Sequence, residues 1–203
     1  MKKKLNYLWY SITVAFVFFT GYLFIPHLHD IEDAVDLGLG FEKHIPYVPF
    51  MALFYLAGYI VILAPAFFFH EYDLFKKGAQ CLLTNMFIAY IFFIFFPVRV
   101  TPVQPVGFFD HLLPYRGIFF DKGWNAFPSL HVAMATSSLL SVMQVSRPVS
   151  FASIFCWSGI FLSTILLKKH YLLDALAGII LGFFTFRFIV WPEMKRKGLS
   201  FVI

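Results

Sequence analysis

Charged residues are scarce in this sequence, and long polar segments are missing from it. Only 13% of the 203 residues are Asp, Glu, Lys or Arg, whereas 60% are hydrophobic and 29 are Phe. Such a chain has no room for a sizeable water-soluble domain, because too few polar residues remain to cover one. Its apolar residues fall in runs of about twenty, the length that crosses a hydrocarbon core. The composition therefore predicts an integral membrane protein.

Cysteine is also nearly absent, since the chain has two, Cys81 and Cys156. Both lie in apolar runs, which argues against a disulfide framework and against a cysteine metal site. Residues 27–33 combine two histidines with three acids, but their spacing matches no defined set of metal ligands. We interpret that segment as a solvated acidic loop. The sequence thus predicts neither a metal nor any other cofactor.

The apolar runs predict six transmembrane helices in one bundle, an all-α membrane domain that covers residues 1–203. The expected spans are about 5–25, 47–69, 80–96, 128–145, 149–167 and 171–191. We interpret the first run as a retained span, because it has no convincing signal-peptide cleavage site. Between the spans we expect an acidic outer loop at 26–46, a short charged turn at 70–78, and a lid or binding loop at 97–127.

The distribution of basic residues predicts the orientation of this bundle. Six spans place both termini on one side, and outside the spans that side carries nine lysines and arginines against six on the other. We therefore expect cytoplasmic termini, with the opposite face directed toward the periplasm or the outside of a bacterial inner membrane. Because the basic residues are divided between two membrane faces instead of forming one stripe, we expect no nucleic-acid partner.

Two polar stretches stand where apolar runs begin. Asn125-Ala126-Phe127-Pro128-Ser129-Leu130-His131 opens the fourth run, and Lys168-Lys169-His170-Tyr171-Leu172-Leu173-Asp174 opens the sixth. Pro128 suits the first position of a helix, so that Ser129, His131 and the free N–H groups of the first turn would form a seat for an anion. His170 and Asp174 are spaced i, i+4 and are expected to share one helix face.

The predicted topology brings both stretches to the same boundary of the membrane. The third and fifth spans end on the outer side, and the fourth and sixth begin there. We therefore expect six polar residues to converge at the outer boundary: Arg99, Ser129, His131, Lys168, His170 and Asp174. Close helix packing is expected around them, because Gly178 and Gly182 lie one turn apart and the segment 133–138 is rich in Ala, Ser and Thr.

The same residues resemble a known family. Pro128-Ser129-Leu130-His131, followed by Ser163-Thr164, His170 and Asp174, resembles the second and third signature motifs of the type 2 phosphatidic acid phosphatase superfamily. The resemblance covers the second half of the chain, and it implies six spans and phosphoryl-transfer chemistry. The chain has Leu130 where the second motif usually has Gly, and Thr164 where the third usually has Arg.

At both positions the chain is similar to the sequences of one branch of the superfamily, which includes inositol phosphorylceramide synthases and many small bacterial homologues. The run Lys168–Tyr171 and the segment Ile45-Pro46-Tyr47-Val48-Pro49 are similar to that branch as well. The first signature motif, Lys and six residues before Arg-Pro, is not present in that form. Arg99 stands at about its place and is the candidate for its phosphate-binding role.

Phosphoryl transfer requires positive charge and hydrogen-bond donors around the phosphate. Arg99, Lys168 and Ser129 at the helix start are the candidates for that role. The loop cation Arg116 either joins them in binding the substrate or faces water.

The reaction also requires a nucleophile and a proton donor. His170 is the candidate nucleophile, which would form a phosphohistidine. Asp174 would set its tautomer and support its positive charge, as the carboxylate does in a serine triad. His131 would protonate the leaving oxygen and then activate the acceptor.

Three functions fit these residues. The first is a lipid phosphatase that hydrolyses a phosphate or diphosphate headgroup from a lipid whose tails lie between the spans. The second is a phosphotransferase, in which an alcohol replaces water as the acceptor. The third is a lipid transporter, for which we would expect broken helices and polar groups near the midplane. We rank hydrolysis first and transfer second. The expected partners are the bilayer and a phosphorylated lipid, and the sequence leaves the lipid and the oligomeric state open.

Overall fold

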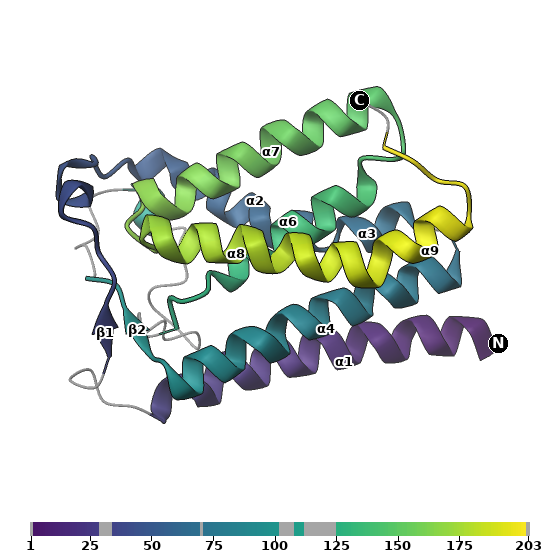
Figure 1. Ribbon diagram of the computed structural model, residues 1–203, viewed down its shortest axis with the longest axis horizontal. Coiled ribbons are helices and arrows are strands. Elements are labelled where there is room, and N and C mark those ends of the chain that lie inside the picture. The colour runs from purple at the N-terminus through teal and green to yellow at the C-terminus, as the bar shows by residue number, and fades with distance from the viewer. Residues whose placement is uncertain (1, 29–33, 70, 102–107, 112–124, 202–203) are drawn as a thin grey trace.

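The computed structural model describes residues 2–28, 34–69, 71–101, 108–111 and 125–201. The helices of its bundle lie side by side along the long axis of the molecule (Figure 1). They are α1 (Lys2–Phe24), α2 (Ala52–Ile62), α3 (Ala64–Phe68), α4 (Tyr72–Phe95), α6 (Leu130–Val142), α7 (Arg147–Leu166) and α8 (Leu172–Thr185), which continues through the π-helical turn η5 (Phe186–Val190) into α9 (Trp191–Arg196). The short elements are η1 (Ile25–His27), β1 (Val35–Asp36), η3 (Gly40–His44), η4 (Pro49–Met51), β2 (Val98–Arg99) and α5 (Phe108–His111). The all-α prediction is confirmed.

Several helices have the length of membrane helices, and the bundle has an apolar surface. Among the described residues, three helical segments are long and apolar enough to cross a membrane, and they are 72–95, 147–166 and 172–196. Three shorter apolar helices, 7–21, 49–62 and 130–142, fall in the other predicted spans. Large apolar side chains such as Phe16, Phe87 and Phe188 are strongly exposed on the helices, as expected where hydrocarbon replaces water. The count of six spans and their orientation stay predictions.

The third predicted span differs most from the structure. Helix α4 begins at Tyr72, so the short turn predicted at 70–78 is wrong for residues 72–78. Asp73 lies in the first turn of α4, where a negative charge interacts favourably with the helix dipole. The helix therefore starts well before its apolar run, because charged residues are tolerated in the part of a helix that projects from the hydrocarbon.

The second predicted span is broken within its apolar run. Helix α2 ends at Ile62 and α3 begins at Ala64, with Pro65 in its first turn. The carbonyl oxygen of Ile62 accepts a hydrogen bond of 3.0 Å from the Ser138 hydroxyl of α6. A neighbouring helix thus satisfies a backbone group beside the break, which lipid cannot do.

Helices α6 and α8 approach each other very closely, as the small residues predict. A Cβ atom built on Gly178 would lie 2.5 Å from the Ser129 carbonyl oxygen, and one built on Gly182 would lie 2.3 Å from that of Ala133. The Ser129 N–H also donates a hydrogen bond of 2.9 Å to the carbonyl oxygen of Asp174. The starts of the two helices are therefore joined backbone to backbone.

A buried hydrogen-bond network ties α4 to this helix pair. Asn85 of α4 is fully buried, and its amide donates to the Ser137 hydroxyl at 3.0 Å. Its amide oxygen accepts from the Thr185 hydroxyl at 2.7 Å. One side chain thereby links α4 to both α6 and α8.

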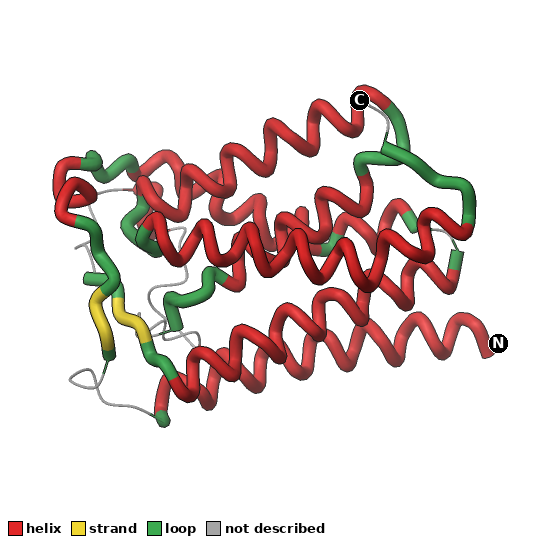
Figure 2. The backbone as a smooth tube through the Cα atoms, in the orientation of Figure 1, coloured by secondary structure: helices red, strands yellow, loops and turns green. Residues whose placement is uncertain are grey.

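Two short strands bring three connecting segments together at one end of the bundle (Figure 2). Strand β1 pairs in parallel with β2, with Asp36 opposite Arg99. On the same β2, Val98 forms a bridge with Asn125, and its carbonyl oxygen accepts from the Ala126 N–H at 3.2 Å. The polar segment before α6 is thus anchored at the end opposite to the start of α1 and the end of α9 (Figure 1).

The close helix contact predicts the effect of one added methyl group. We expect Gly182→Ala to destabilise the protein by about 1–3 kcal/mol, because the new Cβ would clash with the backbone carbonyl oxygen of Ala133 and force the two helices apart. Gly40→Ala is the matched control, since nothing lies within 4 Å of its Cβ position. Thermal unfolding in detergent measures both. Equal unfolding midpoints for the two variants would contradict the packing described for α6 and α8.

Candidate active site

His170 lies in a tight turn between α7 and α8. The carbonyl oxygen of Thr164 accepts hydrogen bonds from the backbone N–H groups of Lys169 at 2.9 Å and His170 at 3.1 Å. Lys168 adopts a φ of 53°, in the left-handed region that such a reversal requires. Tyr171 is the N-cap residue and α8 begins at Leu172, so His170 precedes the helix. The prediction that His170 shares a helix face with Asp174 is therefore wrong, because only Asp174 lies in the helix.

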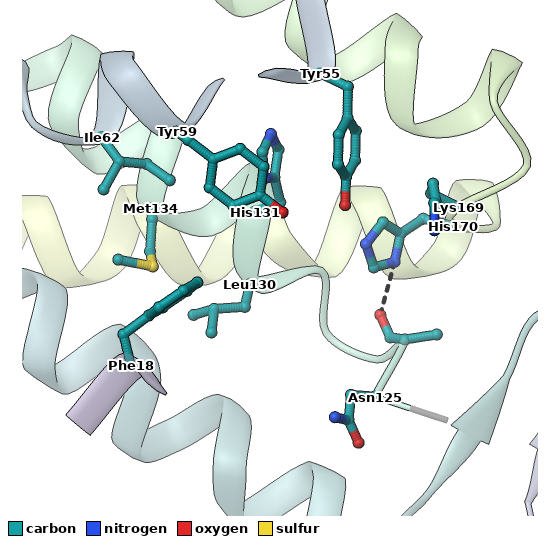
Figure 3. Close-up of a pocket in the computed structure, with 11 residues that line it drawn as sticks. Phe18, Tyr55, Tyr59, Ile62, Asn125, Leu130, His131, Met134, Lys169 and His170 are labelled. Atoms are coloured by element: carbon teal, nitrogen blue, oxygen red, sulfur yellow. Dashed lines mark hydrogen bonds between the residues drawn. The ribbon is translucent and has the colours of Figure 1, made fainter. Parts of the chain in front are cut away.

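The two nitrogens of the His170 ring have different surroundings. Nδ1 lies 3.0 Å from the carbonyl oxygen of Ala126 and 3.9 Å from Oδ2 of Asp174. Only the first distance is a hydrogen bond, and a carbonyl oxygen only accepts, so Nδ1 carries a hydrogen. In the neutral ring Nε2 then keeps its lone pair. Figure 3 shows Nε2 on the side of the ring that faces Tyr55 and His131. The Ala126 carbonyl sets the tautomer here, not the Asp174 carboxylate that we predicted.

Asp174 is fully buried at the start of α8. Its Oδ2 accepts a hydrogen bond of 2.8 Å from the backbone N–H of Tyr171, which caps the helix. Its Oδ1 has no hydrogen-bond partner among the described residues. Oδ2 also lies 3.9 Å from Nδ1 of His170, beyond hydrogen-bond reach. The predicted role in supporting charge is compatible with this distance and stays a prediction.

His131 is held between two tyrosines of α2. Its ring stacks on Tyr55, with the centroids 4.3 Å apart and the planes 1° from parallel, and Tyr59 packs edge-on at 4.9 Å. Its Nε2 is buried and has no hydrogen-bond partner in the described part of the chain. A Cβ atom built on Gly58 would lie 2.1 Å from that nitrogen, so glycine is the one residue that leaves room for the ring.

Both histidines line one small cavity, which we call the histidine cavity. It has a volume of about 40 Å³, which is space for roughly three waters. Lys169 and Asn125 contribute polar groups to its wall, and Tyr55 closes it between the histidines (Figure 3). The predicted meeting of the two polar stretches at one place is confirmed.

The histidines, the turn that carries His170 and the capped start of α6 all lie within the residues that one family model matches. A family model for the PAP2 superfamily, the type 2 phosphatidic acid phosphatases, matches residues 28–188. The chain belongs to the PAP2 superfamily. Searches of curated proteins and of solved structures found no match. Membership supports a phosphatase-type activity for this PAP2 protein.

A second cavity of the PAP2 chain, which we call the polar cavity, also touches His170. Its volume is about 540 Å³, and its wall includes Asp36, Lys43, Lys168 and Tyr171. Lys168 donates a hydrogen bond of 2.7 Å from Nζ to the Glu42 carbonyl oxygen. Burial lowers the pKa of Lys168, and the charge of Glu42 partly opposes that shift. Lys168 therefore lies beside His170 but belongs to the polar cavity.

The other predicted phosphate-binding residues of this PAP2 protein are distributed differently. Ser129 is the N-cap residue of α6, and its hydroxyl accepts from the Val132 N–H at 3.4 Å. Pro128 precedes that cap, so its predicted place in the first helical turn is wrong. Arg99 is exposed on β2 and lines neither cavity. Arg116 lies outside the described residues.

Three residues near the histidines were not predicted to belong to the site. Lys169 lines the histidine cavity, and its place next to His170 was the available signal. Tyr55 lies in an apolar run, and nothing in the sequence indicates its contact with His131. Glu42 is buried in the segment 26–46 that we predicted to be an acidic outer loop, and its carboxylate accepts from the N–H groups of Leu39 at 2.6 Å and Leu172 at 2.7 Å. It therefore holds the start of α8, directly after His170.

The fit of His131 against α2 leads to a test of its position. We expect Gly58→Ala to lower kcat at least tenfold, because the new methyl group would occupy the place of Nε2 and force the His131 ring out of the position to which it returns in each turnover. Gly40→Ala should retain normal turnover, because its added methyl group would have no neighbouring atom within 4 Å. Phosphate release from a lipid substrate measures both. Normal turnover in Gly58→Ala would show that the ring position in the structure has no bearing on catalysis.

A second test concerns the hydrogen bonds by which Glu42 holds the start of α8. Glu42→Ala leaves two partly buried N–H groups without their acceptor, at a cost of up to about 1–3 kcal/mol each, whereas Glu42→Gln keeps one carbonyl acceptor and should lose less. Hydrogen exchange at the Leu172 amide should accelerate in Glu42→Ala. Lys43→Ala, one residue away and exposed, is the control. Unchanged exchange in Glu42→Ala would show that Glu42 does not hold α8.

Proposed function

We propose that this PAP2 protein is an integral membrane lipid phosphatase that removes a phosphate or diphosphate headgroup through a phosphohistidine. The observation that supports this most is the His170 ring, whose Nδ1 is bonded to the Ala126 carbonyl and whose Nε2 faces the histidine cavity. An imidazole nucleophile requires such a lone pair. Lys169 and His131 in the same wall supply a cation and a proton donor.

In the proposed first step, Nε2 of His170 attacks phosphorus, and the bond between phosphorus and the lipid oxygen breaks. The leaving oxygen takes a proton from protonated His131, while Lys169 offsets the charge on the phosphoryl oxygens. In the second step water attacks phosphorus, gives its proton to His131, and the bond to Nε2 breaks. Phosphate leaves and neutral His170 is restored. Asp174 stabilises the positive ring between the two steps.

His131 must turn for these proton transfers, because its Nε2 lies against Gly58. A general acid works within hydrogen-bond reach, about 2.6–3.2 Å from the oxygen that it protonates. Rotation away from Tyr55 would bring Nε2 into the cavity that His131 shares with His170. The stack on Tyr55 is thus the resting position of the proton donor.

We propose that the reaction needs no metal and no other cofactor. A phosphatase with two metal ions uses several carboxylates to hold them, and no Asp or Glu is among the described residues that line the histidine cavity. Cationic side chains and N–H donors would then stabilise the transferred phosphoryl group.

The proposed setting is one six-span domain, residues 1–203, in a bacterial inner membrane. Both termini would be cytoplasmic, and the histidines would face the periplasm or the outside. The six apolar helical stretches support this arrangement. So does the position of β1 and β2 at the end opposite to the start of α1 (Figure 1). The proposed partners are the bilayer and a phosphorylated lipid, and no nucleic acid.

A lipid phosphotransferase is the second candidate, and the polar cavity favours it. An alcohol bound among Asp36, Lys43 and Lys168 would lie close to His170, which lowers the entropic cost of transfer. This function would be like that of the inositol phosphorylceramide synthase branch, which the sequence resembles. A lipid transporter ranks third, because the described polar groups of the site gather at one end of the bundle and not near its middle.

The proposed function predicts the behaviour of one histidine variant. His170→Ala should abolish release of phosphate or pyrophosphate from a panel of phosphorylated lipids, because it removes the nucleophile. His44→Ala, which removes an exposed histidine, should have no effect. The activity of the unmodified protein should persist in excess chelator.

Several outcomes would contradict parts of this proposal. Normal turnover by His170→Ala would exclude the phosphohistidine. Activity that disappears with chelator and returns with a divalent ion would exclude the metal-free reaction. A lipid with an exchanged headgroup as the main product, when alcohols are added, would favour the phosphotransferase. Lipid binding without turnover would favour the transporter.

A further inference from the structure

Three residues that the sequence predicts to bind phosphate do not line the histidine cavity. They are Arg99, Ser129 and Lys168, all of which the structure describes. A phosphoryl group in transfer carries its negative charge on three oxygens, which need positive charge or hydrogen-bond donors around them. Lys169 supplies one such group in the wall of the cavity. The remaining charge requires other donors that line the same cavity.

Tyr55 of α2 presents a hydroxyl group to this cavity. Figure 3 shows its ring between His131 and His170, with the hydroxyl directed toward His170. The cavity has space for roughly three waters, so a group bound in it lies close to the whole of its wall. A phosphoryl group on Nε2 of His170 would therefore lie within reach of the Tyr55 hydroxyl.

Buried contacts fix the position of this hydroxyl. Tyr55 is 4% exposed and belongs to the same buried cluster as Leu167, the C-cap residue of α7. Ahead of α2, the Val48 N–H donates a hydrogen bond of 3.0 Å to the carbonyl oxygen of Leu166. These contacts hold α2 against the end of α7, directly before the turn that carries His170. A donor that is already in place costs no reorganisation during the reaction.

Packing alone does not account for a tyrosine at this position. The stack on His131 needs only an aromatic ring, and this chain supplies such rings as phenylalanine 29 times. A hydroxyl group that leaves water costs free energy unless it forms hydrogen bonds. A bond to the transferred phosphoryl group would offset that cost, because hydrogen bonds to charged oxygens are short and strong.

We infer that Tyr55 is a catalytic residue, whose hydroxyl donates a hydrogen bond to a phosphoryl oxygen while phosphorus moves to and from Nε2 of His170. The inference rests on the proposed phosphatase function, and it adds a donor that no sequence motif indicates. Tyr55 keeps its proton throughout both steps. His131 exchanges protons with the leaving oxygen and with water, so the Tyr55 hydrogen bond changes the rates and not the bonds that form and break.

Removing the hydroxyl tests this role. Tyr55→Phe keeps the ring that stacks on His131 and deletes the donor. We expect kcat for hexadecyl phosphate to fall at least tenfold, because a donor to the transition state is lost. Tyr72→Phe is the matched control, since it deletes a hydroxyl from a partly buried tyrosine at the start of α4, at the other end of the bundle (Figure 1). The control should retain normal turnover.

A second measurement does not depend on turnover. Orthovanadate can adopt the five-coordinate shape of phosphoryl transfer, so its affinity, measured by calorimetric titration, reports contacts made in the transition state. We expect Tyr55→Phe to bind orthovanadate at least tenfold more weakly than Tyr72→Phe does. Equal affinities of these two variants would overturn the inference.

Two further outcomes separate this role from others. If Tyr55→Phe turns over normally whereas Tyr55→Leu is impaired, the ring only positions His131, and the inference fails although the phosphatase proposal stands. If the unmodified protein releases no phosphate from hexadecyl phosphate, the phosphatase proposal fails, while the orthovanadate affinities decide separately whether the hydroxyl contacts a bound phosphoryl group.

Discussion

The site depends on the backbone contact between α6 and α8. In lipid, apolar side chains gain little from leaving their surroundings, so helices associate through close packing and hydrogen bonds. Gly178 lets α8 approach the Ser129 carbonyl oxygen, and the Ser129 N–H donates to the carbonyl oxygen of Asp174. This contact fixes the segment before α6 over the turn before α8. The Ala126 carbonyl oxygen then lies 3.0 Å from Nδ1 of His170, and the tautomer of the proposed nucleophile follows from helix packing.

Much of the fold and the meeting of the histidines could be predicted from the sequence. Apolar runs of the right length indicate helices whatever their partners are, and the parity of those runs places both polar stretches at the same end. Gly178 and Gly182 were informative because two small residues four positions apart commonly mark a close contact between helices in a lipid environment. The boundaries were predicted less well, as at Tyr72, because hydropathy reports where the hydrocarbon begins and not where the helix begins.

Some parts of the site could not be predicted, because no residue type or spacing in the sequence indicates them. A backbone carbonyl such as that of Ala126 is present at every residue, so its role depends on tertiary position alone. Tyr55 is one aromatic residue among many in this chain, and its stack on His131 requires the placement of α2. Glu42 lies in a loop with no periodicity, and its burial follows from the contact of that loop with the start of α8. Each acts across a long sequence separation.

The geometry of the site also bears on whether water or an alcohol accepts the phosphoryl group. In an in-line displacement, the acceptor must attack phosphorus from the position that the lipid oxygen left, opposite to Nε2 of His170. In the proposed mechanism that position would be within the histidine cavity, into which His131 must turn to take the proton of the acceptor. Of the described residues, His170 alone lines both that cavity and the polar cavity, and His131 does not line the polar cavity. An alcohol bound in the polar cavity would be close to the phosphohistidine but away from the base. Water, which is small enough for a space of about 40 Å³, meets both requirements at once. This difference in access to the base is the physical reason for ranking hydrolysis above transfer.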